Sequence, residues 1–325
     1  MKEKPLVVVT EPVNEAAIVL LREVAEIRQL NKPAEEEMAE AVAGAVALFS
    51  KDAATRITQR VLEAGSKLRI VARHGAGYDN VDIAAATRLG IVVTSTPGVN
   101  ADAVAEFALT MMLTLARNLV QANRSLLRGE WARRQFIGTG LQGKKLGLIG
   151  LGNIGTRVAS MAQAFGMVVT YYDPFVSDQA ASKIGAQRSA SLDALLSQAD
   201  VVSIHTALTG ETRELINEQS LRLMKRTALL INNARGPIVN EEALYRALSE
   251  KRLAGAALDV FNEEPLAQDS PLRQLDNVIL TPHLSSSTEE TQRLTAITAA
   301  EEIRLVLSGK APRYPLNPQV LERYR

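Results

Sequence analysis

Short runs of β-branched and other apolar residues recur along this chain, and helix-like stretches separate them. Four runs come first, LVVVT (6–10), AVALFS (45–50), LRIVAR (68–73) and IVVTST (91–96). Six more follow, KLGLIG (145–150), MVVTYY (167–172), VVSIH (201–205), TALLIN (227–232), GAALDV (255–260) and NVILT (277–281). This alternation predicts parallel strands with helices packed on both faces. We therefore expect an α/β fold with two doubly wound parallel sheets.

The length of 325 residues exceeds what a single hydrophobic core usually serves, so two domains are expected. The apolar residues of 99–131 recur at helical spacing and predict one long helix between the two sets of strands. A second helix is predicted over 285–310, where Ser and Thr caps precede glutamates and Gly309 ends the pattern. The tail should return to the first domain. We thus expect a discontinuous domain of 1–100 and 285–325, with 101–284 inserted as the second.

Charge and composition narrow the function classes. The 37 basic and 36 acidic side chains leave a formal charge of +1, without a basic stripe, so nucleic acid is not an expected partner. With no cysteine and only three histidines, no metal site is expected. The N-terminal MKEKPLVVVTEP has too few apolar residues for a signal peptide, and no apolar run reaches the roughly 18 residues of a membrane span. We expect a soluble cytoplasmic protein.

The stretch LGLIGLGNIG places a GxGxxG motif directly after a predicted strand and before a helix-like segment. Gly150 would permit the tight turn, Gly152 would let a pyrophosphate approach the backbone, and Gly155 would let the helix pack on the strand. Asn153 and Ile154 would begin the helix, whose free N–H groups favour an anion. The alternative is a plain strand-to-helix turn. The motif predicts a dinucleotide site.

Asp173 ends the next predicted strand, 18 residues after Gly155. An acidic side chain at this place accepts hydrogen bonds from ribose hydroxyls and repels a 2′-phosphate. The predicted cofactor is therefore NAD rather than NADP. The alternative interpretation is that Asp173 and Pro174 form a simple turn.

Three polar residues follow three successive predicted strands. Arg235 comes after TALLIN, Glu264 (next to Glu263) after GAALDV, and His283 after NVILT. Ligands of doubly wound sheets bind beyond these carboxyl ends. An arginine can grip a carboxylate in two hydrogen bonds, a histidine can exchange a proton with an alcohol, and a carboxylate can orient that histidine. The set suits hydride transfer. Singly, the three could be a surface ion pair, a solvated loop residue and a cap.

These motifs together resemble the D-isomer-specific 2-hydroxyacid dehydrogenases. The resemblance spans nearly the whole chain, through GAGYDNVD (75–82), AEFALTMMLTLAR (105–117), GLGNIG (150–155), NNARGP (232–237), ALDVFNEEP (257–265) and TPH (281–283). It implies a Rossmann NAD domain inserted into a flavodoxin-like substrate domain. It also implies that Arg235 orients the substrate, that His283 is the acid/base, and that Glu264 is its partner; formate dehydrogenases of the family carry Gln there. Further positions expected near the cofactor are His205, Asn233 and Asp259.

The glycine-rich ARHGAGYDN segment, 72–80, is the expected substrate side. The backbone N–H groups of Gly75, Ala76 and Gly77 could form an anion nest, and the resemblance places the substrate carboxylate there. Domain closure would bring this loop to Arg235. Arg73 and Arg133 could meet a substrate phosphate, or be solvated charges.

Within the family, the resemblance is greatest to the phosphoglycerate dehydrogenase branch, so D-3-phosphoglycerate is the first expected substrate. Hydroxypyruvate or glyoxylate reduction is the alternative, and an NAD-sensing corepressor is a remote one. Because the chain stops near 325, a serine-sensing domain and feedback by serine are not expected. A homodimer is expected, with the helix at 102–117 as a candidate interface, although a buried core helix would explain its composition equally well.

Overall fold

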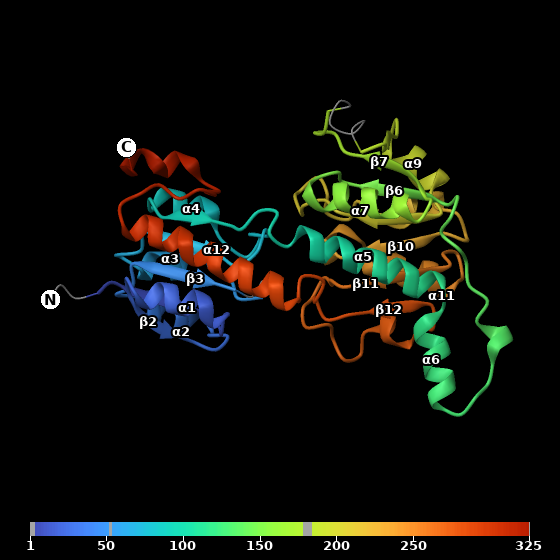
Figure 1. The fold of residues 1–325 in the computed structure, drawn as a ribbon, viewed down its shortest axis with the longest axis horizontal. Helices are drawn as coiled ribbons and strands as arrows, with labels where there is room; N and C mark the ends of the chain where they lie inside the picture. Colours follow the sequence, from blue (N-terminus) through green and yellow to red (C-terminus); the bar gives the residue numbers. More distant parts are fainter. Residues whose placement is uncertain (1–3, 52–53, 178–183, 325) are drawn as a thin grey trace. The chain divides into compact units, whose positions relative to one another are not determined.

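The computed structural model describes residues 4–51, 54–177 and 184–324, and it divides into two compact units (Figure 1). Unit 1 comprises Met1–Asn100 and Ser287–Arg325, and unit 2 comprises Ala101–Ser286. Each unit has a parallel β-sheet with helices on both faces (Figure 1). The prediction of an α/β fold with two doubly wound parallel sheets is confirmed.

The sheet of unit 1 has five parallel strands in the order β2-β1-β3-β4-β5, which is the flavodoxin-like order. The strands are β1 (Leu6–Val9), β2 (Glu26–Gln29), β3 (Ala47–Ser50), β4 (Ile70–Arg73) and β5 (Val92–Thr94). The helices α1 (Glu15–Arg22) and α12 (Glu289–Leu307) cover one face. The other face is covered by α2 (Glu35–Val42), α3 (Gln59–Ala64) and α4 (Ile83–Arg88).

The sheet of unit 2 has seven parallel strands in the order β12-β11-β10-β9-β6-β7-β8. They are β6 (Lys145–Ile149), β7 (Val168–Tyr172), β8 (Gln187–Arg188), β9 (Val201–Ile204), β10 (Leu229–Asn232), β11 (Gly255–Leu258) and β12 (Val278–Leu280). One face carries α5 (Ala101–Ala116) and α7 (Asn153–Ala164), and the other carries α9 (Leu192–Gln198), α10 (Glu218–Leu223) and α11 (Glu241–Ser249). The strand order reverses between β6 and β9, where Rossmann sheets bind their ligands.

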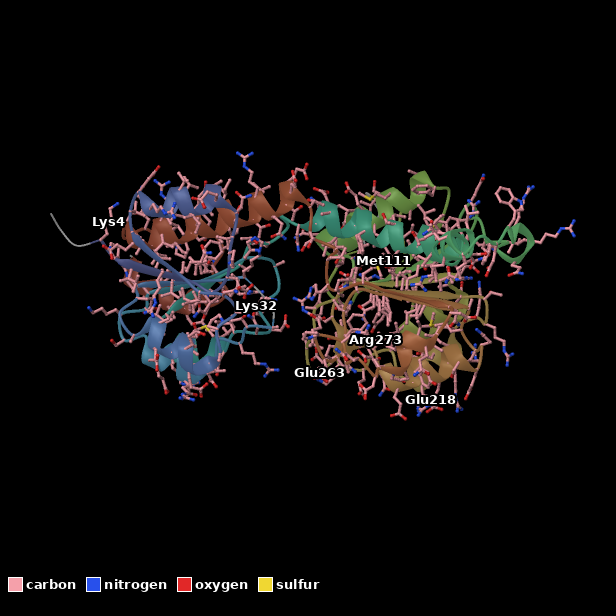
Figure 2. All side chains as sticks on the ribbon, turned by 90° about the horizontal axis from the view of Figure 1, so that it is seen from below. Lys4, Lys32, Met111, Glu218, Glu263 and Arg273 are labelled. Carbon is pink, nitrogen blue, oxygen red and sulfur yellow. The ribbon has the colours of Figure 1, made fainter. Side chains whose placement is uncertain are left out.

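The helix predicted over 99–131 is two helices, α5 and α6 (Leu119–Leu127), which meet at an angle of 61°. Asn118 between them has a left-handed backbone (φ +52°), which ends α5. Most of α5 is buried against α7 and the sheet; Met111, labelled in Figure 2, is 2% exposed. The composition of 102–117 is therefore explained by the core of unit 2. Among the described residues no single helix could cross a membrane, and only the bent pair of α5 and α6 together is long and apolar enough.

The end of the chain packs on unit 1. The backbone N–H of Leu316 donates to the carbonyl of Val93, and the Val93 N–H donates to Asn317 Oδ1 at 2.9 Å. The fully buried Glu302 of α12 accepts hydrogen bonds from the backbone N–H groups of Arg313 and Tyr314. The described part of the 311–325 segment therefore extends the edge of the five-stranded sheet at β5.

Candidate active site

The glycine-rich turn lies between β6 and α7, at the point where the strand order reverses. Gly150 has φ +93°, and a Cβ there would lie 2.7 Å from the His205 carbonyl oxygen, so only glycine fits. A Cβ on Gly155 would lie 2.3 Å from the Gly150 carbonyl oxygen. A Cβ on Gly152 would meet no atom within 4 Å, and no side chain caps α7 after it. This open, uncapped helix start at Asn153 and Ile154 fits a pyrophosphate.

Asp173 lies beside this turn, as its spacing predicted. Its Oδ2 accepts a hydrogen bond from the Leu151 N–H at 2.9 Å, and its Oδ1 accepts one from the Phe175 N–H at 2.8 Å. The carboxylate is therefore fixed next to the glycines, where a ribose would follow a bound pyrophosphate. The residues present fit a dinucleotide.

His205 and Asn233 follow β9 and β10. The His205 N–H donates to the Ile149 carbonyl, its ring Nε2 is 2.8 Å from Ser203 Oγ, and burial lowers its pKa to about 3. Asn233 is 6% exposed, and its Nδ2 donates to the Val104 carbonyl of α5 at 3.0 Å. Both side chains thus serve packing around the dinucleotide turn, and a cofactor contact remains a proposal for each.

Arg235 follows β10 in a turn that the buried Asn232 side chain shapes. Asn232 Oδ1 accepts from the Ala234 N–H at 3.1 Å, and its Nδ2 donates to the Arg235 carbonyl at 3.0 Å. The guanidinium Nη1 of Arg235 donates to the Ala234 carbonyl at 2.7 Å. Sequence reasoning missed Asn232, because an asparagine at a strand end carries no signal that distinguishes a turn-shaping role.

Glu264 and His283 form a direct pair. Glu264 Oε2 is 2.7 Å from His283 Nδ1, and Glu264 Oε1 accepts from the Phe261 N–H at 3.1 Å. The two side chains are 28% and 34% exposed, respectively. Because Nδ1 faces the carboxylate, Nε2 is the ring nitrogen left for a proton exchange with substrate.

The charges of this pair act on each other. The Glu264 hydrogen bond raises the pKa of His283, burial lowers it, and the Glu264 charge raises it further, so the net shift is upward. Burial raises the pKa of Glu264, but the hydrogen bond and charge of His283 outweigh burial and leave it below its usual value. The nearby Arg235 charge lowers both pKa values. The structure therefore brings together the three residues that the sequence placed at one sheet edge.

Asp259 holds the turn that carries His283. Its fully buried carboxylate accepts four hydrogen bonds, from Thr281 Oγ1 (2.6 Å), Leu284 N–H (2.9 Å), Ser285 N–H (2.8 Å) and Ser285 Oγ (2.6 Å). Its backbone carbonyl accepts from the His283 N–H at 2.8 Å. His283 has φ +50°, a left-handed conformation that costs free energy in a non-glycine residue. The Asp259 contacts offset that cost, a role that its predicted place near the cofactor did not include.

The glycine-rich loop after β4 belongs to unit 1. Gly75 has φ +124°, and its N–H donates to Thr96 Oγ1 at 3.0 Å, while its carbonyl accepts from the Thr96 N–H. Within the described ranges, the N–H groups of Ala76 and Gly77 donate to no acceptor. Of the three amides in the predicted nest, the Gly75 N–H is therefore occupied by Thr96, and an anion contact at Ala76 and Gly77 stays a prediction.

The two arginines predicted to meet a phosphate have different surroundings. Arg73 is 4% exposed, and its guanidinium donates to the carbonyls of Lys51 (2.8 Å) and Gly77 (3.2 Å), which joins the loops after β3 and β4. The buried Arg73 side chain therefore stabilises the conformation of the glycine-rich loop. Arg133 is exposed in the short helix η1 (Arg133–Gln135) of unit 2, next to Trp131, which is 86% exposed.

Comparison with known proteins shows which proteins this chain is similar to. Residues 109–285 match the family model of the D-isomer specific 2-hydroxyacid dehydrogenase, NAD binding domain. A D-3-phosphoglycerate dehydrogenase of Synechocystis is 44% identical over 324 residues, which is 98% of this chain and 58% of that protein. A glyoxylate reductase of Aeropyrum pernix is 41% identical and covers 98% of both chains. This chain thus spans less than two thirds of the phosphoglycerate dehydrogenase that it matches.

Solved structures agree with these relatives. An NADPH-dependent glyoxylate/hydroxypyruvate reductase from Sinorhizobium meliloti, in complex with NADP and malonate, has a TM-score of 0.87 at 28% identity. The alignment covers 97% of each chain. The likeness therefore extends over both units and includes a protein that holds a nicotinamide dinucleotide.

Proposed function

This chain belongs to the D-isomer-specific 2-hydroxyacid dehydrogenase family, and we propose that its substrate is D-3-phosphoglycerate, oxidised with NAD. As a member it is an oxidoreductase that interconverts a D-2-hydroxy acid and a 2-keto acid with a nicotinamide dinucleotide. The observation that supports its catalytic residues is the 2.7 Å contact between Glu264 and His283, with the Arg235 charge acting on both.

Each of the three residues has one task in the proposed reaction. A bound NAD would supply the acceptor for the hydride that leaves the substrate C2. His283 Nε2 takes the proton from the C2 hydroxyl, and returns it when the keto acid is reduced. The Arg235 guanidinium holds the substrate carboxylate in two hydrogen bonds and polarises the C2 oxygen. Glu264 stabilises the imidazolium that forms on His283.

The proposed preference for NAD rests on Asp173. Its carboxylate is fixed beside the glycine turn by two backbone N–H groups, so a 2′-phosphate placed there would meet a negative charge. The matched reductase from Sinorhizobium meliloti is NADPH-dependent, so the family alone does not decide the cofactor. The test is kcat/KM for NADH against NADPH with one keto acid; comparable values would remove the proposal.

The substrate proposal is supported by the 44% identity with a D-3-phosphoglycerate dehydrogenase and by the resemblance of GAGYDNVD to that branch. The test compares initial rates of NAD-dependent D-3-phosphoglycerate oxidation with NADH-dependent reduction of hydroxypyruvate, glyoxylate and pyruvate. We expect the phosphorylated substrate to give the highest kcat/KM, because an added phosphate offers a further charged contact. Activity confined to the small keto acids would overturn it.

The second candidate is reduction of glyoxylate or hydroxypyruvate, and the burial of Arg73 favours it. With 4% of its surface exposed and its guanidinium bound to loop carbonyls, Arg73 offers little for a phosphate to contact. The Aeropyrum pernix relative, which matches over the whole length of both chains, is a glyoxylate reductase. The same set of initial rates separates the two candidates, and turnover of any of these acids argues against a corepressor role.

We also propose a cytoplasmic homodimer, with a different interface from the one expected on 102–117. Five large apolar side chains are more than half exposed in one stretch of unit 2: Leu119, Leu126, Leu127, Trp131 and Ile137. Several large exposed apolar side chains in one segment favour association. Light scattering should give twice the chain mass for the wild type and the chain mass for a Leu127→Asp/Trp131→Asp variant. A wild-type monomer would contradict the proposal.

A further inference from the structure

In the loop that carries Glu264, two consecutive backbone N–H groups each donate a hydrogen bond to a carboxylate. The Phe261 N–H donates to Glu264 Oε1 at 3.1 Å, and the Asn262 N–H donates to Glu241 Oε1 at 2.5 Å. Glu241 is the first residue of α11, on the crossover between β10 and β11. A residue outside the three strand-end turns thus binds the turn that carries Glu264.

The Phe261–Asn262 peptide lies in close contact with the turn that carries Arg235. A Cβ on Gly236 would lie 1.9 Å from the Phe261 carbonyl carbon and 2.5 Å from the Asn262 nitrogen. No side chain fits there, so the backbone after Arg235 touches the backbone before Glu264. The Phe261–Asn262 peptide is therefore fixed by a steric contact with Gly236 and by a hydrogen bond to Glu241.

We propose that Glu241 is a positioning residue for the hydride-transfer site, because its bond to Asn262 fixes the turn from which Glu264 reaches His283. The inference rests on the proposed function, since it concerns the same acid/base pair. Glu241 contacts this turn through its hydrogen bond with the Asn262 N–H. It acts through the Asn262 peptide.

The charge of Glu241 adds a second effect. Glu241 is half-buried; burial raises its pKa, the Asn262 N–H lowers it, and the Glu264 charge raises it again, with a net upward shift. Ionised, Glu241 adds negative potential near the pair. The other charged groups that face His283 are Glu264, Arg235 and Asp259, and Glu263 and Asp269 line the groove beside Glu241. Loss of the Glu241 charge should therefore lower the pKa of His283.

A bland alternative is that Glu241 only stabilises the N-terminus of α11, where acidic residues are favourable. Its neighbour Glu242 provides the matched control, because it lies in the same first turn and forms an exposed i,i+4 ion pair with Arg246 at 2.6 Å. Glu242→Ala removes the same helix-end charge without touching the Asn262 peptide. Glu241→Gln keeps an acceptor for Asn262, and Glu241→Ala removes it.

The experiment measures kcat, KM and NADH Kd for the three variants, and the pKa of His283 by NMR of ¹³C-labelled histidine. We expect Glu241→Ala to lose about 10-fold or more in kcat at unchanged NADH Kd, because misplaced catalytic groups are costly. Its His283 pKa should fall by about half a unit or more. Glu241→Gln should keep kcat within about threefold of wild type, and Glu242→Ala should match wild type in every value.

Two results would overturn the proposal. Either Glu241→Ala keeps wild-type kcat and His283 pKa, or Glu241→Gln is as impaired as Glu241→Ala, which would make the acceptor irrelevant. A parallel loss of NADH affinity in Glu241→Ala would also overturn it, since the defect would then be in unit 2 as a whole. His283→Ala tests the proposed function separately: if it keeps turnover, that function fails whatever Glu241 does.

Discussion

Replacing Glu264 by Gln should lower the pKa of His283 and move the pH dependence of turnover. Gln keeps an oxygen that can accept from Nδ1, so the variant removes mainly the charge. The atoms are 2.7 Å apart and both side chains are about one-third exposed. For charge centres about 4 Å apart, Coulomb's law gives about 1 kcal/mol in water and about 4 at a protein surface. An intermediate value of about 2 kcal/mol corresponds to a fall of about 1.5 pKa units.

The sign follows from the role of His283. Reduction of a keto acid needs the imidazolium as proton donor, so kcat/KM falls as pH rises through the His283 pKa. In the wild type that limb should lie above the ordinary value of 6.5, because the folded pKa is raised. In Glu264→Gln it should lie about 1.5 units lower, since burial and Arg235 still oppose protonation.

Two assays check this prediction. One is kcat/KM for hydroxypyruvate reduction between pH 5 and 9, and the other is histidine NMR. The chain has three histidines, and burial lowers the pKa of His74 to about 4 and of His205 to about 3, so the histidine signal that titrates at the highest pH is assigned to His283. An equal loss of rate at every pH, with the limb and the NMR pKa unmoved, would refute the reasoning and leave Glu264 only the orientation of the ring.

Three further substitutions test the rest of the site. His283→Ala should keep NADH affinity and lose roughly 10²- to 10⁴-fold in kcat; near-normal turnover would show that another group exchanges the proton. Arg235→Lys should lose about 10²-fold or more in kcat/KM, because a single ammonium charge replaces the planar guanidinium and its two parallel hydrogen bonds. Steady-state kinetics with a 2-keto acid substrate checks this prediction. Asp259→Ala leaves up to four donors without their acceptor and should lower the free energy of unfolding by about 3 kcal/mol or more, measured with urea; a loss below about 1 kcal/mol would mean that water replaces the carboxylate.

The strand pattern in the sequence predicted most of both sheets, because central parallel strands are buried on both faces and read as continuous apolar runs. It missed β2, whose residues EIRQ lie at a sheet edge, and the two-residue edge strand β8. Most residues of these two edge strands are exposed, and neither strand has an apolar run. The break between α5 and α6 was missed because helical periodicity continues across Asn118, whose left-handed backbone no pattern reports.

The residues of the candidate site also fall into those that the sequence predicted and those that it did not. The residues proposed to do the chemistry were identifiable from the sequence, since Arg235, Glu264 and His283 are polar groups directly after apolar strands. The residues that hold them were not. Asn232 and Glu241 act through hydrogen bonds to backbone N–H or carbonyl groups, and such contacts depend on how turns approach each other rather than on spacing along the chain.

The register of the seven-stranded sheet fixes the positions of the site residues, so changes in turn length at the opposite edge of the sheet do not move them. Asn232, Leu258 and Leu280 are register partners across β10, β11 and β12, so these strands end level with one another, about 4.8 Å apart. The crossovers that join them run back to the opposite edge, where turns such as the one at Lys251 (φ +53°) lie. Residues added in that turn would lengthen the chain without moving the three strand ends. A single residue inserted within β11 would instead displace Asp259 and Glu264 together, by about 3.3 Å, and would disturb the turn that Asp259 holds. Evolution and engineering can therefore change the turns at the opposite edge of this sheet while the ends of β10, β11 and β12 keep their relative positions.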